Sequence, residues 1–325
     1  MPPESDNVLL SVEDLHTHFL MRGGVARAVD GVSFSIRERE TVALVGESGC
    51  GKSVTALSLA RLVPQPPGHY AGGRILFRGR DILRMGEKEL GQLRGRDISY
   101  VFQEPAESLN PVFTVGYQIE EALRLHRPDA PRREEVLRLM TLVGLPDPEQ
   151  RMSAYPHQLS GGMQQRAMIA MALACNPALL VADEPTTALD VTIQAQIMEL
   201  LGSLQQRLGM AVLLITHNLG LVADVAHRIN VMYAGRIVES GPTERVLRNP
   251  RHPYTRGLLD AVPRIEGTAG RLKGIEGTVP NPRSLPAGCA FHPRCFKCQA
   301  RCRTEEPGVE KCEEEHEVRC HFWRT

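Results

Sequence analysis

The sequence has no excess charge of either sign, no long apolar run and no apolar leader, and each absence excludes a class of protein. Lys plus Arg and Asp plus Glu balance at 38 each, so the net charge gives no argument for binding to nucleic acid or to an anionic membrane. The longest apolar runs, such as 211–215, have the length of a buried strand and are too short to span a bilayer. The first residues, MPPESDNVLLS, lack the basic and apolar stretches of a signal peptide. We therefore expect a cytoplasmic protein, with any membrane part supplied by other subunits.

Cysteine is scarce in the body of the chain, where Cys50 and Cys175 stand alone. The other six crowd the C-terminal end: Cys289, Cys295, Cys298, Cys302, Cys312 and Cys320. In a cytosolic chain this clustering favours metal binding over disulfides. Cys175 lies in an apolar helical run and is predicted to be a core residue.

The order of elements predicts an α/β fold. Short apolar strands at 41–45, 179–183 and 211–216 alternate with helical stretches, which is typical of a parallel core. Apolar strands at 8–19 and 31–36 precede it and predict an antiparallel β-subdomain. The helical block at about 85–165 is interpreted as an insertion. Near Asn249 Pro and Gly become frequent and periodicity is lost, so we expect a main domain over 1–250 and a loop-rich tail over 251–325.

A phosphate-binding loop follows the strand at 41–45. The pattern GxxxxGK[ST] is matched by Gly46, Glu47, Ser48, Gly49, Cys50, Gly51, Lys52 and Ser53. Glycines let backbone N–H groups converge on phosphates, and the following helix N-terminus adds positive charge. Lys52 is predicted to reach the β- and γ-phosphates of ATP, and the Ser53 hydroxyl to ligate Mg²⁺.

Two carboxylates end the apolar strand at 179–183. Asp183 is predicted to hold the Mg²⁺ shell, and Glu184 to polarise the attacking water. Buried strands often end in acidic residues, so this pair alone is weak evidence for a nucleotide site. It becomes informative because a phosphate-binding loop lies earlier in the chain. Together the two motifs predict an MgATP-hydrolysing domain.

The segment Leu159-Ser-Gly-Gly-Met163 decides among phosphate-loop proteins. It resembles the LSGGQ motif of the ATP-binding cassette family, with Met163 in place of Gln. A Gly turn at a helix start is itself a phosphate-binding surface, and a second one makes sense if it faces another subunit's nucleotide. The resemblance implies a RecA-like core and a head-to-tail dimer in which Ser160, Gly161 and Gly162 contact the partner's ATP.

Other positions match the family in order. Gln103 resembles the Q-loop glutamine, which senses the metal and contacts the membrane subunit. Asp190 resembles the D-loop aspartate at the dimer interface, and His217 the switch histidine that contacts the γ-phosphate. Phe19 lies where an aromatic that stacks on adenine is expected, although a Phe near a strand end is commonly a core residue.

The tail narrows the resemblance. The segment from Asn249, NPRHPYTRGLL, and the later GCAFHPRC are similar to the C-terminal extension of oligopeptide and dipeptide permease ATPases, and IEGTVPNPRSLPAGC is closer to their D-type subunit. This implies an importer ATPase that powers uptake of di- or oligopeptides or a related solute. The implied partners are an F-type ATPase, two permease subunits and an external solute-binding protein, at the cytoplasmic face of the inner membrane.

The tail cysteines predict a metal site. Cys289, Cys295, Cys302 and Cys320 have the spacing C-x5-C-x6-C-x17-C, and four thiolates in a loop-rich segment suit a tetrahedral metal or a [4Fe–4S] cluster. The family resemblance implies the cluster at this spacing. Zinc remains an alternative because Cys295-x2-Cys298 resembles a zinc pair, and Cys312 can replace Cys320.

Two further expectations concern other residues. Cys50 lies near Lys52 and a helix N-terminus, both of which lower a thiol pKa, so we expect alkylation at Cys50 to block ATP binding. The alternative function is a soluble cassette ATPase acting on DNA or ribosomes. The chain has one cassette and no sustained heptads between 53 and 159, which disfavours that alternative.

Overall fold

The computed structural model describes residues 7–187, 189–262 and 274–324. The chain divides into two compact units, each of which is described by itself. The first contains residues 1–36, 41–83 and 216–325, and the second contains residues 37–40 and 84–215. Within the described ranges, no helix combines the length and the apolar character needed to cross a membrane.

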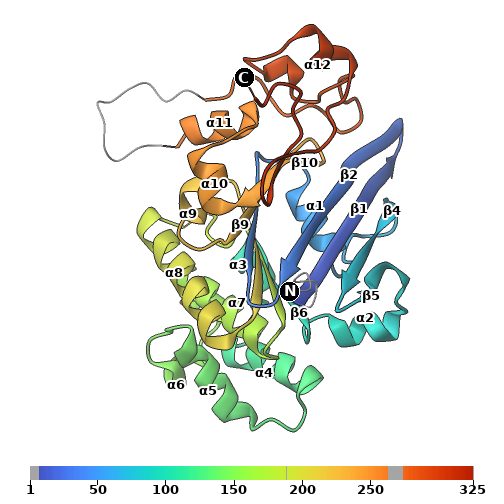
Figure 1. Ribbon diagram of the computed structural model, residues 1–325. Helices are drawn as coiled ribbons and strands as arrows, with labels where there is room; N and C mark the ends of the chain where they lie inside the picture. The colour runs from blue at the N-terminus through green and yellow to red at the C-terminus, as the bar shows by residue number, and fades with distance from the viewer. Residues whose placement is uncertain (1–6, 188, 263–273, 325) are drawn as a thin grey trace, which may run out of the picture. The chain divides into compact units, whose positions relative to one another are not determined.

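The first unit contains a four-stranded sheet in which β1 and β2 are long neighbouring strands (Figure 1). Its order is β2-β1-β4-β5, and the strands are Val8–Met21 (β1), Gly24–Arg37 (β2), Gly68–Phe77 (β4) and Arg80–Asp81 (β5). A bulge in β1 near Asp14 moves the buried face from Leu10 and Val12 to Leu15 and Thr17. The sheet confirms the expected β-subdomain, and β1 and β2 extend beyond the predicted ranges 8–19 and 31–36.

The first unit also holds five strands in the order β11-β12-β10-β9-β3. They are Thr41–Val45 (β3), Arg228–Tyr233 (β9), Arg236–Pro242 (β10), Glu310–Glu313 (β11) and His316–Val318 (β12). Strand β3 is buried throughout and pairs in parallel with β9, as expected for a covered α/β strand. The tail thus continues the sheet of the main domain, because β12 pairs antiparallel with β10.

A buried polar network fastens the tail to β10. Glu239 is fully buried and lies 2.8 Å from Nε2 of His316 on β12. Its carboxylate also accepts hydrogen bonds from the backbone N–H groups of Arg251 at 2.7 Å and His252 at 2.9 Å. A buried carboxylate needs such partners, so this network requires the tail to be docked.

The helices of the first unit are short. They are Lys52–Ser58 (α1), Leu219–Val222 (α9), Thr243–Arg248 (α10), Pro253–Asp260 (α11), His292–Arg294 (η4) and Ala300–Thr304 (α12). A short 3-10 turn, Ile82–Arg84 (η2), lies where the chain passes to the second unit.

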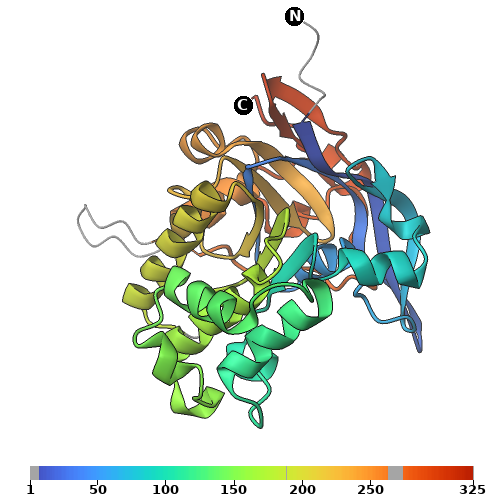
Figure 2. The ribbon, with the colours of Figure 1, turned by 90° about the horizontal axis from the view of Figure 1, so that it is seen from below.

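The second unit has three parallel strands in the order β8-β7-β6. They are Ile98–Val101 (β6), Leu179–Asp183 (β7) and Ala211–Thr216 (β8). Its helices are Glu87–Leu93 (α2), Pro105–Ser108 (α3), Val115–His126 (α4), Arg132–Leu142 (α5), Pro148–Arg151 (α6), Pro156–Gln158 (η3), Gly161–Leu173 (α7) and Val191–Leu208 (α8). Helices α4, α5 and α7 pack on one another, and Figure 2 shows them as a group in green to yellow-green. The expected inserted helical subdomain is confirmed as part of the fold.

Candidate functional site

The phosphate-binding loop lies between β3 and α1 in the first unit. Gly46 has a φ of 157° and Gly51 a φ of 109°, in the region that favours glycine. A Cβ on Gly46 would lie 2.3 Å from the carbonyl oxygen of Met232, and one on Gly51 would lie 2.3 Å from that of Ala28. The loop is therefore packed so closely on its own unit that only glycine fits at these two positions.

Lys52 is buried behind this loop. Its ammonium donates hydrogen bonds to the carbonyl oxygens of Gly46 at 2.8 Å and Glu47 at 3.0 Å. Ser53, one residue further into α1, is exposed. A cationic donor below the loop and an exposed hydroxyl at its end suit a magnesium-bound phosphate chain, so the residues present fit the predicted ligand.

The expectation for Cys50 is wrong. The residue is fully buried, and burial raises the pKa of its thiol; the nearby Lys52 charge lowers it only in part. A buried neutral thiol is inert to alkylating reagents. The sequence argument counted the charges around Cys50 and missed the packing against Gly46, where an added Cβ would lie 2.8 Å from the sulfur. The prediction for Cys175 holds, since that side chain is buried.

Two other predicted nucleotide contacts belong to the first unit. Phe19 lies near the end of β1, opposite Gly68 of β4, and is half-buried. His217 is exposed and directly follows β8. Their accessibility is compatible with contact to a nucleotide, and their roles stay predictions.

The carboxylate pair lies in the second unit at the end of β7. Asp183 is buried, and Glu184 follows it with a φ of 46°. One oxygen of Glu184, Oε2, accepts a hydrogen bond from the Thr187 hydroxyl at 3.0 Å and lies 3.5 Å from the Gln103 side-chain nitrogen. The structure thus brings together Gln103 and Glu184, which are 81 residues apart.

Ser160 and Asp190 begin two neighbouring helices of the same unit. Ser160 is the N-cap of α7, and its hydroxyl accepts from Met163 N–H at 3.4 Å. Asp190 is the N-cap of α8, where its carboxylate accepts from Ile193 N–H at 3.0 Å. An added Cβ on Gly162 would lie 2.9 Å from the Ile193 side chain, so this glycine also allows close packing of α7 on α8. Both capping residues are exposed.

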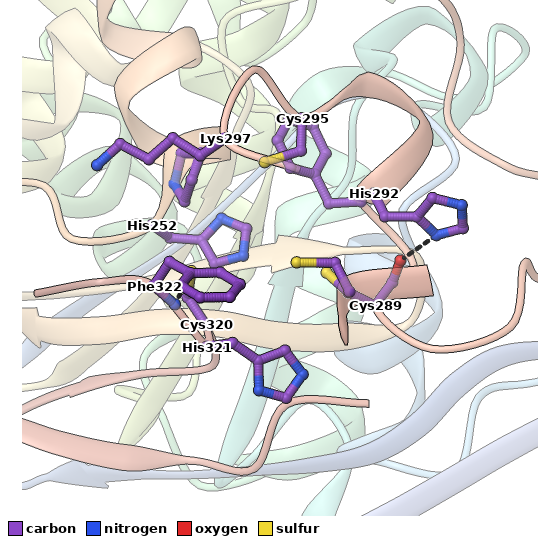
Figure 3. Close-up of a pocket in the computed structure, with 11 residues that line it drawn as sticks. His252, Cys289, His292, Cys295, Lys297, Cys320, His321 and Phe322 are labelled. Carbon is purple, nitrogen blue, oxygen red and sulfur yellow. Dashed lines mark hydrogen bonds between the residues drawn. The ribbon is translucent and has the colours of Figure 1, made fainter. Parts of the chain in front are cut away.

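Four tail cysteines line one small pocket in the first unit. They are the four predicted ligands Cys289, Cys295, Cys302 and Cys320, and Figure 3 labels Cys289, Cys295 and Cys320 beside His252 and Phe322. The backbone joins two of them, because Cys289 N–H donates to the carbonyl oxygen of Cys302 at 2.9 Å. Cys298 and Cys312 do not line this pocket; their thiols lie near the carbonyl oxygens of Gln299 and His316.

The pocket shields its thiols from water. Burial raises the pKa of Cys289 and Cys320 and raises that of Cys295 to about 12, with neighbouring cysteines adding to the shift. The backbone N–H of Phe322 lies 3.4 Å from the Cys320 sulfur and faces it as a donor. A bound cation would lower these pKa values again, because thiolate is the form that binds a metal.

The separation of the sulfur atoms bears on the occupant. Throughout the described ranges, no three cysteine sulfurs lie within 4.8 Å of one another. Zn–S bonds of about 2.3 Å require sulfurs about 3.8 Å apart in a tetrahedral site. The sulfur atoms therefore do not stand in the positions of a formed tetrahedral zinc site.

A second group of metal-ligand type lies on β1 and β2. The ligand atoms of His16, His18 and Asp30 fall within 4.8 Å of one another. Asp30 also pairs with the Arg236 guanidinium at 2.8 Å, and the carboxylate accepts from His16 at 3.0 Å. A guanidinium so close repels a divalent cation, and the hydrogen bonds and ion pairs account for the group.

Sequence reasoning missed two residues at the phosphate-binding loop. The hydroxyl of Tyr254, on α11, accepts from Glu47 N–H at 2.8 Å. The Arg294 guanidinium, from η4, forms a two-pronged ion pair with the Glu47 carboxylate. Both lie in the tail more than 200 residues from the loop, and no local pattern marks them.

Comparison with known proteins adds the family. The sequence profile described as "ABC transporter" matches residues 29–187, and that of "Oligopeptide/dipeptide transporter, C-terminal region" matches 238–302. The chain is 50% identical to a putative peptide import ATP-binding protein of Brucella ovis, over 97% of each chain. It is 48% identical to the dipeptide transport ATP-binding protein DppD of Escherichia coli, over 97% of this chain and 96% of that protein.

Solved structures agree with this assignment. A post-hydrolysis dimer of the ATP-binding cassette MJ0796, bound to ADP and Pi, is 28% identical with a TM-score of 0.65, covering 72% of this chain and 98% of that one. CbiO1 of Clostridium perfringens, part of an ABC transporter complex, is 27% identical with a TM-score of 0.65, over 75% and 92%. The similarity includes the P-loop core predicted from the sequence.

Proposed function

The chain belongs to the ABC transporter family, and from that premise we propose that it is the ATP-hydrolysing subunit of an importer for dipeptides or oligopeptides. The observation that carries this proposal is the tail. Residues 238–302 match the C-terminal region of oligopeptide and dipeptide transporters, and the relatives named above match over nearly the whole chain. The comparisons support an importer over a soluble ATPase acting on DNA or ribosomes.

We propose the following nucleotide roles, which the burial and hydrogen bonds of these residues within each unit support. Lys52 and the loop glycines would bind the β- and γ-phosphates, and Phe19 the adenine. Magnesium bound with ATP neutralises charge on the phosphates, and Ser53, Asp183 and Gln103 would hold it. Glu184 would orient and deprotonate the attacking water, with His217 at the γ-phosphate.

The remaining site residues point to a partner. Ser160, Gly161 and Gly162 offer a second phosphate surface, which would face the ATP of a second cassette, with Asp190 crossing the interface. We propose an F-type ATPase as that cassette. Two permease subunits and an external solute-binding protein would complete the transporter, with this chain peripheral at the cytoplasmic membrane face. The predicted domains, 1–250 with its helical part at about 85–165 and 251–325, describe this cassette and its peptide-permease extension.

We propose that Cys289, Cys295, Cys302 and Cys320 hold a [4Fe–4S] cluster. The support is their shared pocket and the donor N–H at Cys320. When bound, a cluster would cross-link the tail segments that supply the four cysteines. The chain's own residues would supply ligands and exclude water.

Replacing Cys302 by Ser is expected to remove most of the bound iron, because it removes one of four ligands. Cys298→Ser is the matched control: it alters a thiol four residues earlier in the chain that does not line the pocket. Iron, zinc and sulfide contents and the visible spectrum of anaerobically purified protein measure the effect. Zinc without iron in the wild type, or equal loss of iron in both variants, would contradict the assignment.

The importer function is tested on the assembled complex. We expect the chain to co-purify with membrane permease subunits, and dipeptides presented by the solute-binding protein to stimulate ATP hydrolysis in liposomes. Stimulation is the decisive result because a solute can change the rate of ATP hydrolysis only if it binds one conformation of the transporter more tightly than the other. Co-purification with ribosomes or DNA, without stimulation by any peptide, would refute the proposal.

A further inference from the structure

The tail contacts the phosphate-binding loop at Glu47, and this contact joins two sites that the sequence treats as separate. We propose that Arg294 and Tyr254 are positioning residues for the phosphate-binding loop and that they couple nucleotide binding to the cysteine pocket. The inference rests on the proposed ATP-binding function and extends it to regulation of the same site.

Arg294 is fixed on Glu47. Its two terminal nitrogens lie 2.7 Å and 2.9 Å from the two carboxylate oxygens, which is the bidentate geometry of a strong ion pair. The arginine side chain is 5% exposed and the glutamate 31% exposed, so the pair is shielded from salt. The Glu47 carboxylate raises the pKa of Arg294 and keeps it charged.

The rest of the guanidinium is also held. Arg294 Nε donates to the carbonyl oxygen of Glu276 at 2.9 Å, and the guanidinium lies over the Tyr233 ring at 5.8 Å from its centroid. One further nitrogen contact reaches the hydroxyl of Tyr233 at 3.4 Å. A side chain restrained on so many sides cannot follow Glu47 if the loop moves, so it sets the position of the loop.

Tyr254 holds the backbone of the same residue. The Tyr254 hydroxyl accepts from Glu47 N–H at 2.8 Å, and the side chain is fully buried. Its ring lies 4.7 Å from Tyr233 and 5.3 Å from Phe291, centroid to centroid. These aromatic rings form one block that links α11, β9 and the cysteine segment.

The charge balance gives Arg294 a function in binding. Glu47 is the second residue of the loop that receives the ATP phosphates, and an unbalanced carboxylate there would repel them. The Arg294 guanidinium cancels that charge and holds the carboxylate away from the loop interior. Loss of Arg294 should therefore weaken ATP more than AMP, which carries less charge.

The same residues touch the cysteine pocket. Arg294 directly precedes Cys295, and Phe291 lines the pocket two residues after Cys289. A ligand that orders this segment from the pocket side therefore favours the position in which Arg294 pairs with Glu47. Binding linkage is reciprocal, so ATP binding should in turn favour the ordered form of the segment that carries Cys289 and Cys295.

Nucleotide affinity of the full chain tests the first half. Arg294→Gln is expected to raise the Kd for MgATP by about tenfold, the effect of losing a charge-assisted hydrogen bond of about 1.5 kcal/mol, with a smaller change for AMP. Arg301→Gln, which removes an exposed arginine of α12, should leave the Kd at the wild-type value. The double variant Glu47→Gln/Arg294→Gln should bind ATP more tightly than Arg294→Gln, because the unbalanced carboxylate is gone. Rescue of this kind does not follow from a merely structural role.

Thiol chemistry of the metal-free wild type tests the second half. Cys295, unlike the fully buried Cys50, is partly exposed, so N-ethylmaleimide can reach its thiol, although slowly because burial raises its pKa. MgATP is expected to slow this alkylation about fivefold, within the usual range of coupling between sites. Cys298 in the same segment, whose thiol does not line the pocket, is the internal control and should react at one rate with and without ATP. In Tyr254→Phe, which removes only the acceptor of Glu47 N–H, the protection should shrink.

The outcomes separate the two proposals. A wild-type chain that binds no MgATP would refute the proposed function itself. A wild type that binds MgATP, with Arg294→Gln within twofold of its Kd or with Cys295 reacting equally with and without ATP, would overturn the coupling alone. If Arg294→Gln does not fold, the wild-type alkylation rates and the protection measured in Tyr254→Phe still decide the question.

Discussion

Glu184→Gln is expected to lower kcat for ATP hydrolysis by about 10²- to 10⁴-fold, the usual contribution of a general base. Gln keeps the size and polarity of the side chain but cannot take the proton of the attacking water. Affinity for MgATP should stay within about twofold, since the lost interaction belongs to the transition state. ATP should therefore bind and persist, and the measurement is single-turnover hydrolysis beside equilibrium binding.

The local geometry explains why this residue should carry the effect. Glu184 has a φ of 46°, and such a conformation costs about 1–3 kcal/mol in a residue other than glycine. Its N–H nevertheless donates to the carbonyl oxygen of Ile215 at 2.9 Å, so the sheet keeps the backbone in place. Thr187 and Gln103 both approach one carboxylate oxygen and orient the group. A strained, oriented carboxylate at a strand end is the arrangement expected of a catalytic base.

The matched control is Glu199→Gln on α8, which alters an exposed glutamate of the same unit and should leave kcat unchanged. Thermal unfolding of both variants checks that they are folded. A Glu184→Gln protein that retained more than about a tenth of the wild-type kcat would show that another group activates the water.

The features that sequence predicted well are those encoded by neighbouring residues. Strands β3, β7 and β8 are continuous apolar runs, because both faces of each strand are buried. The ends of such a run mark the ends of the strand, so the sequence predicted their bounds. The phosphate-binding loop was predicted because its glycines are required by φ and by close backbone approach. The four tail cysteines that the family resemblance implied as ligands share a pocket, whereas their spacing alone had left Cys298 and Cys312 as alternatives.

What sequence could not predict depends on contacts made across the fold. The burial of Cys50 comes from packing around the loop, so counting nearby charges gave the wrong direction for its pKa. The Arg294–Glu47 pair joins residues 247 apart, and each looks like an ordinary surface charge in sequence. Strand β12 of the tail pairs with β10, although Pro and Gly suggested a separate loop-built segment. Tertiary partners, which one sequence does not reveal, set all three features.

Lys52→Ala is expected to weaken MgATP binding by about 10- to 150-fold, because a hydrogen bond to a charged group contributes about 1.5–3 kcal/mol. In the structure the ammonium donates to the Gly46 and Glu47 carbonyl oxygens, where it is poised behind the loop that would receive the phosphates. Bound ATP would draw those donors to its β- and γ-phosphates. The measurement is the Kd for MgATP, MgADP and AMP on the purified chain.

The ligand series separates the two tasks of Lys52. Binding to the distal phosphates predicts a loss that is largest for ATP, smaller for ADP and least for AMP, which has neither a β- nor a γ-phosphate. Holding the loop predicts equal losses for all three and a lower unfolding temperature, since both carbonyl partners lose a buried donor. Lys88→Ala, at an exposed position on α2, is the control for removing one positive charge. A graded loss assigns Lys52 to the phosphates, a uniform one assigns it to the loop, and unchanged affinity for ATP would contradict both.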